Sequence, residues 1–334
     1  MSQQLVFITG ATGFIGAHVA TQILKAGYRV RLSIRRLEQI EKLKNHFNNF
    51  ANQLDFVHVP NFTKPDAFEE AVRDVHFVVH IASPMLGQGS DFKKDYIDPA
   101  VQGTISVLNA AKSAPSVQRV LVMSSILALM PLGGLQDPSI SIQENSGKKL
   151  EVDANMDVPD GPAGNAVMYQ GSKILAHEKT REWVLENSPT FSLFTFHPTF
   201  VVGPSIFQER FEQIDSINKF FFDTVRTGNI IIPPLFVDVR DVADAFVGAL
   251  VATIPDGQEF ILTGQPTSWP EVGKEAKALY PDAKFELEST AKEGSPMDVV
   301  PQAANRFLNI KWKSLTDLVR GVLDQQLALE AQAV

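Results

Sequence analysis

The sequence contains no cysteine, and its 334 residues carry a formal net charge of −8. Without cysteine the chain can form no disulfide, no thiolate metal site and no thiol nucleophile. The acidic balance argues against a general nucleic-acid or acidic-membrane binder, but it leaves room for a local basic pocket. We expect no metal site either, because His76 and His80 lie in an apolar run typical of a strand and no carboxylate cluster completes a ligand set.

Targeting and membrane signals are also missing from the sequence. Met1 to Gln4 lead directly into an apolar run, with no basic segment before it, and no apolar run approaches the roughly 18 residues of a membrane helix. There is no G-x-S-x-G motif of a serine hydrolase. We therefore expect a cytoplasmic protein that binds a small molecule and neither nucleic acid nor membrane, as a monomer or a homodimer.

The stretch from Leu5 to Gly16 carries the strongest binding signal. Leu5 to Ile8 is an apolar run typical of a buried strand, and Ala17 to Lys25 has the period of a helix. Between them, glycines recur at a spacing of three, at Gly10, Gly13 and Gly16. A strand, a glycine turn and a helix form the context of a dinucleotide fingerprint. In it the first glycine permits the tight turn, the second admits the pyrophosphate, and the third lets the helix pack on the strand.

Strand and helix patterns then alternate along the chain, which predicts an α/β fold with a doubly wound parallel sheet of the Rossmann type. The expected strands are 5–8, 28–34, 54–59, 75–82, 119–124 and 192–197, and the expected helices are 17–25, 37–50, 66–72, 99–114 and 169–186. Residues 130–168 are rich in Gly, Pro, Asp, Asn and Ser and are expected to form a long loop, functional or mobile. We expect 1–200 with about 236–252 to form the dinucleotide domain. A smaller mixed α/β C-terminal substrate lobe is expected from about 203–235 and 253–334, interleaved with it.

A catalytic pair is indicated by Tyr169 and Lys173. Positions four apart share one face of a helix, so the two side chains can act together. The phenol of tyrosine has a pKa of about 10, and a nearby ammonium lowers that pKa towards neutrality. The predicted strand before this helix ends in Ser124 and Ser125, which adds a candidate hydroxyl donor.

Taken together, these motifs resemble the extended short-chain dehydrogenases/reductases of the dihydroflavonol-reductase and cinnamoyl-CoA-reductase type, and most of all the fungal NADPH-dependent aldehyde and ketone reductases. The resemblance covers nearly the whole chain. It includes the G-x-x-G-x-x-G spacing, His80 to Pro84, Asp98 to Thr104, Ser124-Ser125, Tyr169 to Lys173, Pro198 to Pro204, Phe236 to Asp244, Phe307 to Ile310 and Ser314-Leu315.

The resemblance implies a role for each matching residue. Tyr169 is the general acid that protonates the carbonyl oxygen, Lys173 lowers its pKa and binds the nicotinamide ribose, and Ser125 hydrogen-bonds the substrate oxygen. The cofactor-binding residues implied in the same way are Thr9, Gly10, Thr12, Gly13, Phe14, Ile15, Gly16, Arg35, Arg36, Asn61, Phe62, Ala82, Ser83, Tyr169, Lys173, Pro198 and Val201.

The end of the second predicted strand indicates the cofactor. NAD-specific folds place an acidic residue there, which would repel a 2′-phosphate, whereas this sequence has Arg35 and Arg36. We therefore expect NADPH/NADP+. Asn61 stands where the family usually has Asp at the adenine edge, and its side-chain oxygen is expected to accept a bond from the adenine amino group.

These observations favour an NADPH-dependent carbonyl reductase that transfers hydride to an aldehyde or ketone. The expected substrate pocket is apolar and is lined by Met85, Ser125, Ile126, Leu127 and Phe200. Two alternatives stay open: a nucleotide-sugar epimerase or dehydratase of the same fold, and a non-catalytic NADP-sensing protein.

Overall fold

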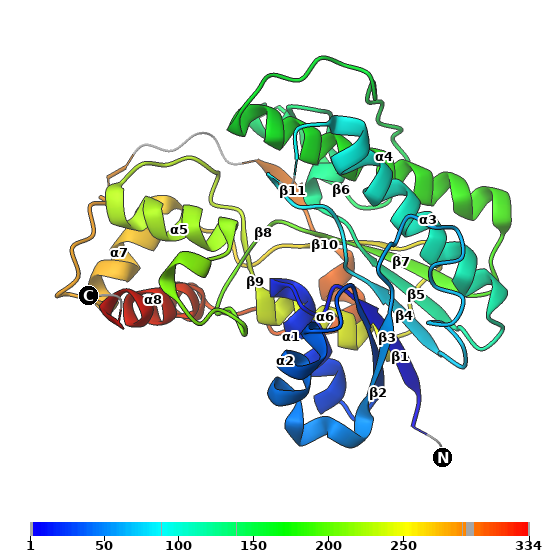
Figure 1. Cartoon of the computed structure of the whole chain (residues 1–334). Helices are drawn as coiled ribbons and strands as arrows, with labels where there is room; N and C mark the ends of the chain where they lie inside the picture. Colours follow the sequence, from blue (N-terminus) through cyan, green and yellow to red (C-terminus); the bar gives the residue numbers. More distant parts are fainter. Residues whose placement is uncertain (1–2, 88, 138, 289, 292–296, 333–334) are drawn as a thin grey trace.

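The computed structural model describes residues 3–87, 89–137, 139–288, 290–291 and 297–332. Its centre is a parallel seven-stranded sheet with the strand order β10-β7-β5-β4-β1-β2-β3 (Figure 1). The strands are β1 Leu5–Thr9, β2 Arg29–Ile34, β3 Leu54–His58, β4 Phe77–His80, β5 Arg119–Met123, β7 Ser192–Pro198 and β10 Glu259–Leu262. The order reverses between β1 and β4, and such a switch point is where doubly wound sheets bind their ligands. The predicted fold class is confirmed.

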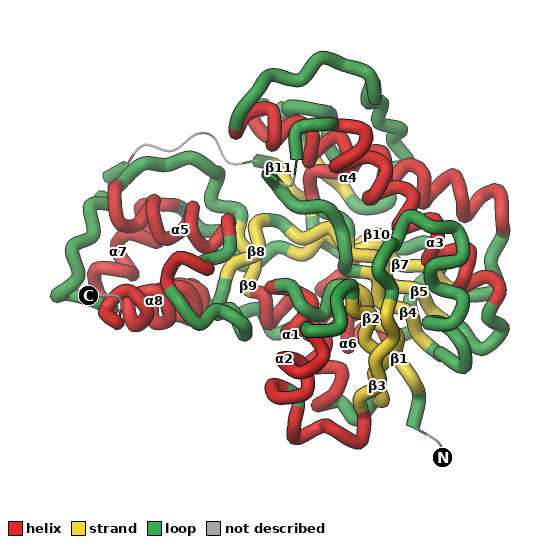
Figure 2. Tube along the Cα trace, viewed as in Figure 1, coloured by secondary structure: helices red, strands yellow, loops and turns green. Residues whose placement is uncertain are grey.

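Helices cover both faces of this sheet (Figure 2). On one face, apolar side chains of α1 and α6 pack on the strands, and on the other face those of α3 and α4 do so. β1 is buried along its whole length, as the apolar run from Leu5 predicts for a strand covered on both sides. The helices of the sheet domain are α1 Phe14–Lys25, α2 Gln39–His46, α3 Asp98–Ser113, α4 Pro162–Asn187 and α6 Val239–Val251.

A second lobe has its own core, in which Phe221, Trp269 and Val319 are fully buried. Its helices are α5 Ser216–Thr227, α7 Trp269–Leu279 and α8 Leu315–Gln332, beside the parallel pair β8 Phe200–Val202 and β9 Phe236–Asp238. Another parallel pair, β6 Ser141–Gln143 and β11 Asp298–Val300, joins the long segment before α4 to the C-terminal part of the chain. Short helical turns span Asn48–Gln53, Phe92–Ile97, Ile126–Leu129, Gly134–Gln136, Phe211–Gln213 and Ala304–Leu308.

Several predicted element boundaries are wrong. Residues 66–72 form consecutive turns instead of a helix, although Phe68 and Val72 are buried as their spacing requires. The helix expected over 37–50 breaks at Phe47, and the helix expected over 169–186 starts earlier, at Pro162, where proline favours a first turn. β10, which lies within the range expected for the substrate lobe, adds to β7 as an edge strand of the central sheet.

No helix among the described residues combines the length and the apolar character that crossing a membrane requires.

Candidate active site

The glycine turn between β1 and α1 leaves the start of the helix open. Gly10 has a φ of +80°, and a Cβ there would lie 2.8 Å from the backbone nitrogen of Ala82. A Cβ on Gly16 would lie 2.1 Å from the oxygen of Gly10, so both positions exclude a side chain. Gly13 is the N-cap of α1, which has no side-chain cap and no acidic residue in its first turn. The unsatisfied N–H groups and the positive end of the helix dipole therefore fit a phosphate.

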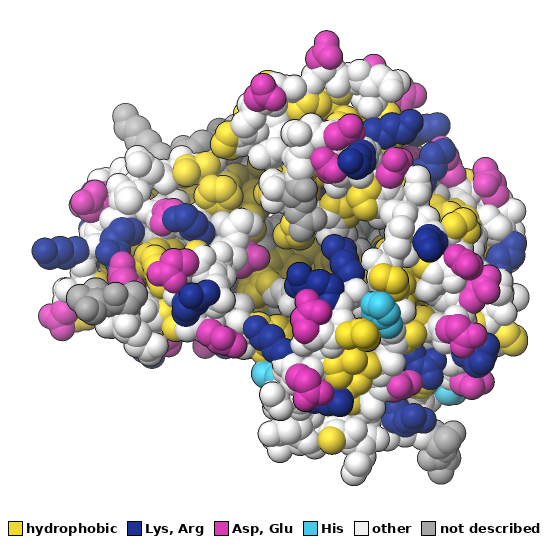
Figure 3. All heavy atoms as spheres, viewed as in Figure 1, with side chains coloured by type: hydrophobic (Ala, Val, Ile, Leu, Met, Phe, Trp, Pro, Cys, Tyr) yellow, Lys and Arg dark blue, Asp and Glu magenta, His cyan; other side chains and the backbone are white. Residues whose placement is uncertain are grey.

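A cleft of about 310 Å³ opens at this helix end. Figure 3 shows the surface hollowed between the second lobe and the sheet domain. Residues from both parts line the cleft: Thr12, Gly13, Phe14, Ala17 and Lys42 from the sheet domain, and Ser205, Ile206, Phe207, Gln208, Gln213 and Asp215 from the segment that leads to α5.

The side chains of two predicted cofactor residues, Thr9 and Val201, are buried and contact other parts of the protein. Thr9 is fully buried, its Oγ1 lies 2.9 Å from Nδ1 of His80, and it accepts the backbone N–H groups of Ile81 and Ala82. It thereby ties the ends of β1 and β4 together at the switch point. The side chain of Val201 is likewise part of the apolar core beside the sheet.

The two arginines after β2 differ in their surroundings. The guanidinium of Arg35 lies 6.0 Å from the centre of the Phe62 ring, so the structure brings two predicted cofactor residues together. The Arg36 side chain, also exposed, pairs with Glu38 at 3.2 Å. Gln39 fixes the turn, because its side-chain oxygen accepts the backbone N–H groups of both arginines. Arg35 is therefore the better candidate for an anionic ligand.

The predicted use of the Asn61 oxygen does not fit the structure. This oxygen already accepts two hydrogen bonds from Thr63, one from its backbone N–H and one from its hydroxyl. A side-chain carbonyl oxygen has two lone pairs, so only the amide nitrogen of Asn61 keeps capacity for a ligand.

Tyr169 and Lys173 lie one turn apart on α4, as predicted. The Nζ of Lys173 donates to the hydroxyl of Ser83 at 2.9 Å and lies 5.4 Å from the centre of the Tyr169 ring. Ser83 follows β4, next to the glycine turn in the sheet order. This contact therefore places α4 against the strand end at which a dinucleotide is expected.

The pKa of Tyr169 shifts in the direction opposite to the one expected. Burial, together with the negative charge of Asp215, raises the pKa of this phenol to about 12. Burial lowers the pKa of Lys173 to about 8. The expected lowering of the phenol pKa is not seen, since the ammonium faces the Tyr169 ring and the Ser83 hydroxyl.

Ser125 directly precedes a short helical turn, and its Oγ accepts the backbone N–H of Leu127 at 3.2 Å. Gln170, the neighbour of Tyr169, fastens this segment to α4. Its side chain donates to the oxygens of Leu127 and Pro131, at 3.4 and 3.0 Å, and accepts the N–H of Gly133 at 2.9 Å. Gln170 thus keeps the chain after Ser125 beside the start of α4 that carries Tyr169, a role that the sequence analysis missed.

A buried histidine supports the backbone of Ser125. Nδ1 of His197 lies 3.1 Å from the oxygen of Ser125, and Nε2 lies 2.9 Å from the hydroxyl of Thr195. A carbonyl oxygen can only accept, so Nδ1 carries the proton and Nε2 accepts from Thr195. Burial lowers the pKa of His197 to about 3, which keeps the ring neutral at physiological pH. A histidine inside a buried, largely apolar strand was the available signal for this role.

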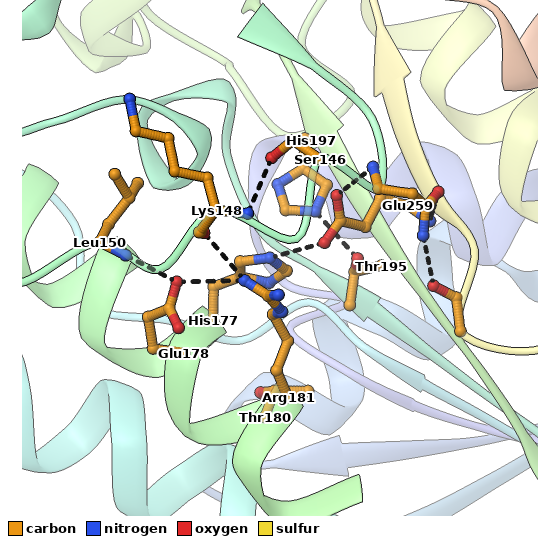
Figure 4. A network of polar contacts seen from close by, with 12 residues as sticks. Ser146, Lys148, Leu150, His177, Glu178, Thr180, Arg181, Thr195, His197 and Glu259 are labelled. Carbon is orange, nitrogen blue, oxygen red and sulfur yellow. Dashed lines mark hydrogen bonds and ion pairs between the residues drawn. The ribbon is translucent and has the colours of Figure 1, made fainter. Parts of the chain in front are cut away.

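His197 is in turn packed by a second buried histidine. His177 lies edge-on to it at 4.7 Å between ring centres and contacts Glu259 of β10 at 3.1 Å (Figure 4). Glu259 also accepts the backbone N–H of Asn145, which anchors the long segment before α4. The edge strand β10 therefore helps to hold Ser125 in place.

The predicted substrate-pocket residues fall into two groups. Ile126 is 3% exposed and packs in a core with Met130, Ile142 and Ile261. Met85 is 43% exposed after β4, and the side chains of Leu127 and Phe200 are half-buried. The segment after β5 therefore turns inward at Ile126, and the other three apolar residues are the more accessible ones.

Comparison with known proteins adds independent findings. The model of the family described as "NAD dependent epimerase/dehydratase family" matches residues 6–262. Ketoreductase sphI of Aspergillus fumigatus is 33% identical over 344 residues, covering 98% of both chains. The structure of yeast methylglyoxal/isovaleraldehyde reductase Gre2 complexed with NADPH has a TM-score of 0.84 and 25% identity, covering 98% of this chain and 100% of that one. A UDP-glucuronic acid 4-epimerase from Bacillus cereus shares the fold at a TM-score of 0.69 and 17% identity, covering 98% and 100%.

Proposed function

Since the chain belongs to the NAD dependent epimerase/dehydratase family, we propose that it is an NADPH-dependent carbonyl reductase that converts an aldehyde or ketone into an alcohol. The protein is an oxidoreductase, as is the ketoreductase that it is similar to, and its cofactor is NADPH, with which the similar Gre2 structure is complexed. The contact of Lys173 with Ser83 carries the proposal, because it sets the Tyr169 helix beside the dinucleotide-binding strand end.

The residues at the cleft fit this cofactor. Gly10 and Gly16 keep the turn free of side chains, and the uncapped start of α1 would hold the pyrophosphate. Arg35, stacked towards Phe62 and without an ion pair in the described part of the chain, would bind the 2′-phosphate with charge-assisted hydrogen bonds. When bound, the cofactor supplies the hydride.

The side chains around the carbonyl group have separate tasks. Tyr169 gives its phenolic proton to the carbonyl oxygen, and Ser125 donates a hydrogen bond to the same oxygen. These donors stabilise charge that develops only as the C=O bond is reduced. A phenol pKa near 12 keeps Tyr169 protonated at neutral pH, as a proton donor must be. Lys173, with a pKa near 8, is largely cationic there and stabilises the phenolate left behind.

The proposed substrate is a small carbonyl compound with an apolar body. Phe200, Leu127 and Met85 are the partly exposed apolar residues near the strand ends that would contact it. Because such sites are mostly apolar with a few polar anchors, aryl or alkyl ketones should react better than sugars.

The test is NADPH consumption, followed at the nicotinamide absorbance band, with a panel of ketones, α-keto esters, aldehydes and UDP-sugars. We expect steady consumption with at least one carbonyl class. Turnover of a UDP-sugar without added cofactor would instead identify an epimerase. Tight NADPH binding without consumption across the panel would indicate a sensor.

A further inference from the structure

A small cavity lies beside Lys173, between α3, α4 and the ends of β4 and β5. Its volume of about 20 Å³ exceeds the roughly 10–15 Å³ that one water molecule needs. Among the described residues that line it, Lys173, His177 and His80 are the ionisable ones, and several hydroxyl groups add to its polar wall. The proposed reaction gives a task to Lys173 but none to His177.

The buried side chain of His177 has one nitrogen to which the fold gives no partner. His177 is 4% exposed, and its Nδ1 makes no hydrogen bond with any described residue. Thr104 and Thr180, which also line the cavity, donate their hydroxyls to the carbonyl oxygens of Ala100 and Ala176. Their hydroxyl protons are therefore not free for Nδ1. Since buried polar atoms are nearly always hydrogen-bonded, a water molecule is the partner that a polar cavity of this size would provide.

Glu259 determines what kind of partner this nitrogen needs. Nε2 of His177 lies 3.1 Å from Oε1 of Glu259 (Figure 4). Burial favours the protonated carboxyl, but the hydrogen bond from His177, with smaller contributions from other neighbours, lowers the pKa of Glu259 to about 2. An ionised carboxylate can only accept, so Nε2 carries the proton and Nδ1 of the neutral ring is an acceptor. Nδ1 therefore needs a donor, which an O–H group of water supplies.

Lys173 has the complementary capacity. An ammonium group carries three N–H donors, and one of them binds the hydroxyl of Ser83. Lys173 and His177 are four residues apart on α4, so their side chains leave the same face of the helix, and both line the cavity. A water molecule between them can accept from the ammonium and donate to Nδ1 at the same time.

The other titratable groups around Lys173 come from several elements. Tyr169 lies one turn before it on α4. His80 at the end of β4 and His197 on β7 interact electrostatically with Lys173, but burial lowers the pKa of each to about 3, so both rings are neutral. The described residues that α3 and β5 contribute to the cavity wall are not ionisable. A hydrogen bond from the ammonium to a held water is thus a main contribution that this wall can make to the charge of Lys173.

We propose that this cavity binds one water molecule, which joins Nδ1 of His177 to the ammonium of Lys173, and that His177 is a positioning residue that keeps Lys173 charged. The inference deepens the proposed function, in which the Lys173 charge stabilises the phenolate. The water restores one hydrogen bond of the hydration that burial removes from the ammonium. Loss of the acceptor at position 177 therefore lowers the pH at which Lys173 loses its charge.

The first test is a high-resolution crystal structure of the parent protein with NADP+ bound. We expect one ordered water in the cavity, within hydrogen-bond distance of both Nδ1 of His177 and Nζ of Lys173. The structure of His177→Phe, which offers no acceptor, should lack that water. A parent cavity without an ordered water, or with one that contacts neither atom, would overturn the proposal, whether or not the variants fold.

The second test measures NADPH affinity by fluorescence over the neutral to alkaline pH range. The parent affinity should fall with a midpoint near the Lys173 pKa of about 8. In His177→Phe and His177→Gln the midpoint should fall by about one pH unit, because a buried hydrogen bond that supports a charged group is lost. Glutamine still reaches Glu259 but has a carbon at the δ position. His177→Asn should keep the parental midpoint, since its amide oxygen takes the place of Nδ1 and accepts the same bond.

His76→Asn is the matched control. Nδ1 of His76 accepts the backbone N–H of Leu5 at the opposite end of β4, so the same substitution there should leave the midpoint unchanged. A parental midpoint in both His177→Gln and His177→Phe would refute the role of His177. Equal shifts in His177→Asn and His177→Gln would show that His177 acts through its ring packing or its contact with Glu259, which would also overturn the proposal. The carbonyl reductase assignment does not depend on these results, because neither test measures turnover.

Discussion

The Nζ of Lys173 lies 5.4 Å from the centre of the Tyr169 ring and donates its hydrogen bond to Ser83. The ammonium thus faces the flat side of the phenol instead of its oxygen. Lys173 is therefore anchored independently of the tyrosine hydroxyl. The consequences can be tested separately for the two residues.

Removing the phenolic hydroxyl should abolish proton donation alone. We expect Tyr169→Phe to lower kcat by about 10²- to 10⁴-fold, the usual contribution of a positioned general acid, and to leave NADPH affinity nearly unchanged. Steady-state kinetics and cofactor fluorescence measure the two quantities. Tyr280→Phe is the control, because Tyr280 donates to Asp324 on the second lobe. A Tyr169→Phe enzyme that keeps most of its rate would refute the assignment.

The charge of Lys173 should make NADPH binding depend on pH. With a pKa near 8, Lys173 loses its proton, and so its charge, as the pH rises through that value. The affinity for NADPH is therefore expected to be full below about pH 7 and to weaken above about pH 8. Lys173→Arg stays charged throughout this range, so its binding curve should be flat. A parent curve that is equally flat would contradict this role.

The cofactor preference should depend on Arg35 more than on Arg36. Arg35→Ala should lower the ratio of catalytic efficiencies with NADPH and NADH by about tenfold, since a hydrogen bond to a charged group is lost at an exposed site. Arg36→Ala should have a smaller effect, because Arg36 already pairs with Glu38. Added salt should weaken NADPH binding and leave NADH binding almost unaffected. If the ratio does not move, Arg35 is merely a solvated surface residue.

Alanine substitutions at two glycines of the same turn should have different effects, one on stability and the other on cofactor binding. In Gly16→Ala the new Cβ would lie 2.1 Å from the oxygen of Gly10, so the free energy of unfolding should fall by about 1–3 kcal/mol or more. In Gly13→Ala the Cβ would meet that same oxygen only at 3.4 Å, so the protein should fold normally but bind NADPH poorly. Thermal unfolding and cofactor binding, measured on both variants, separate the two effects. Equal thermal stability of the two variants would contradict this assignment.

The sequence correctly predicted structural features that depend on residues close together in the chain. The glycine turn from Gly10 to Gly16 and the pairing of Tyr169 with Lys173 on a helix follow from short spacings, and the structure has both. The sequence predicts a helix over 66–72, whereas the structure has consecutive turns there. The spacing of the apolar residues does not distinguish the two, because the turns also bury Phe68 and Val72.

Features built by distant segments could not be predicted in this way. The charge of Asp215, which precedes α5, helps to raise the pKa of Tyr169, and the Asn61 oxygen is occupied by a turn that the motif does not reveal. Ile126 is buried because β6 and β10 supply Ile142 and Ile261 around it. His197 supports Ser125 across neighbouring strands, a contact that depends on strand order and register.

The parallel pairing of β6 with β11 also sets an order of assembly. A chain leaving the ribosome can complete its first five strands and α4 before residues 298–300 have been made. Until then β6 has no strand partner, and Glu144 lacks the backbone N–H groups of Gln302 and Ala303 that it later accepts. α4 is therefore made before β6 gains its strand partner. A nascent or truncated chain would expose the apolar side chains around Ile142. Such a chain is a target for chaperones and proteases.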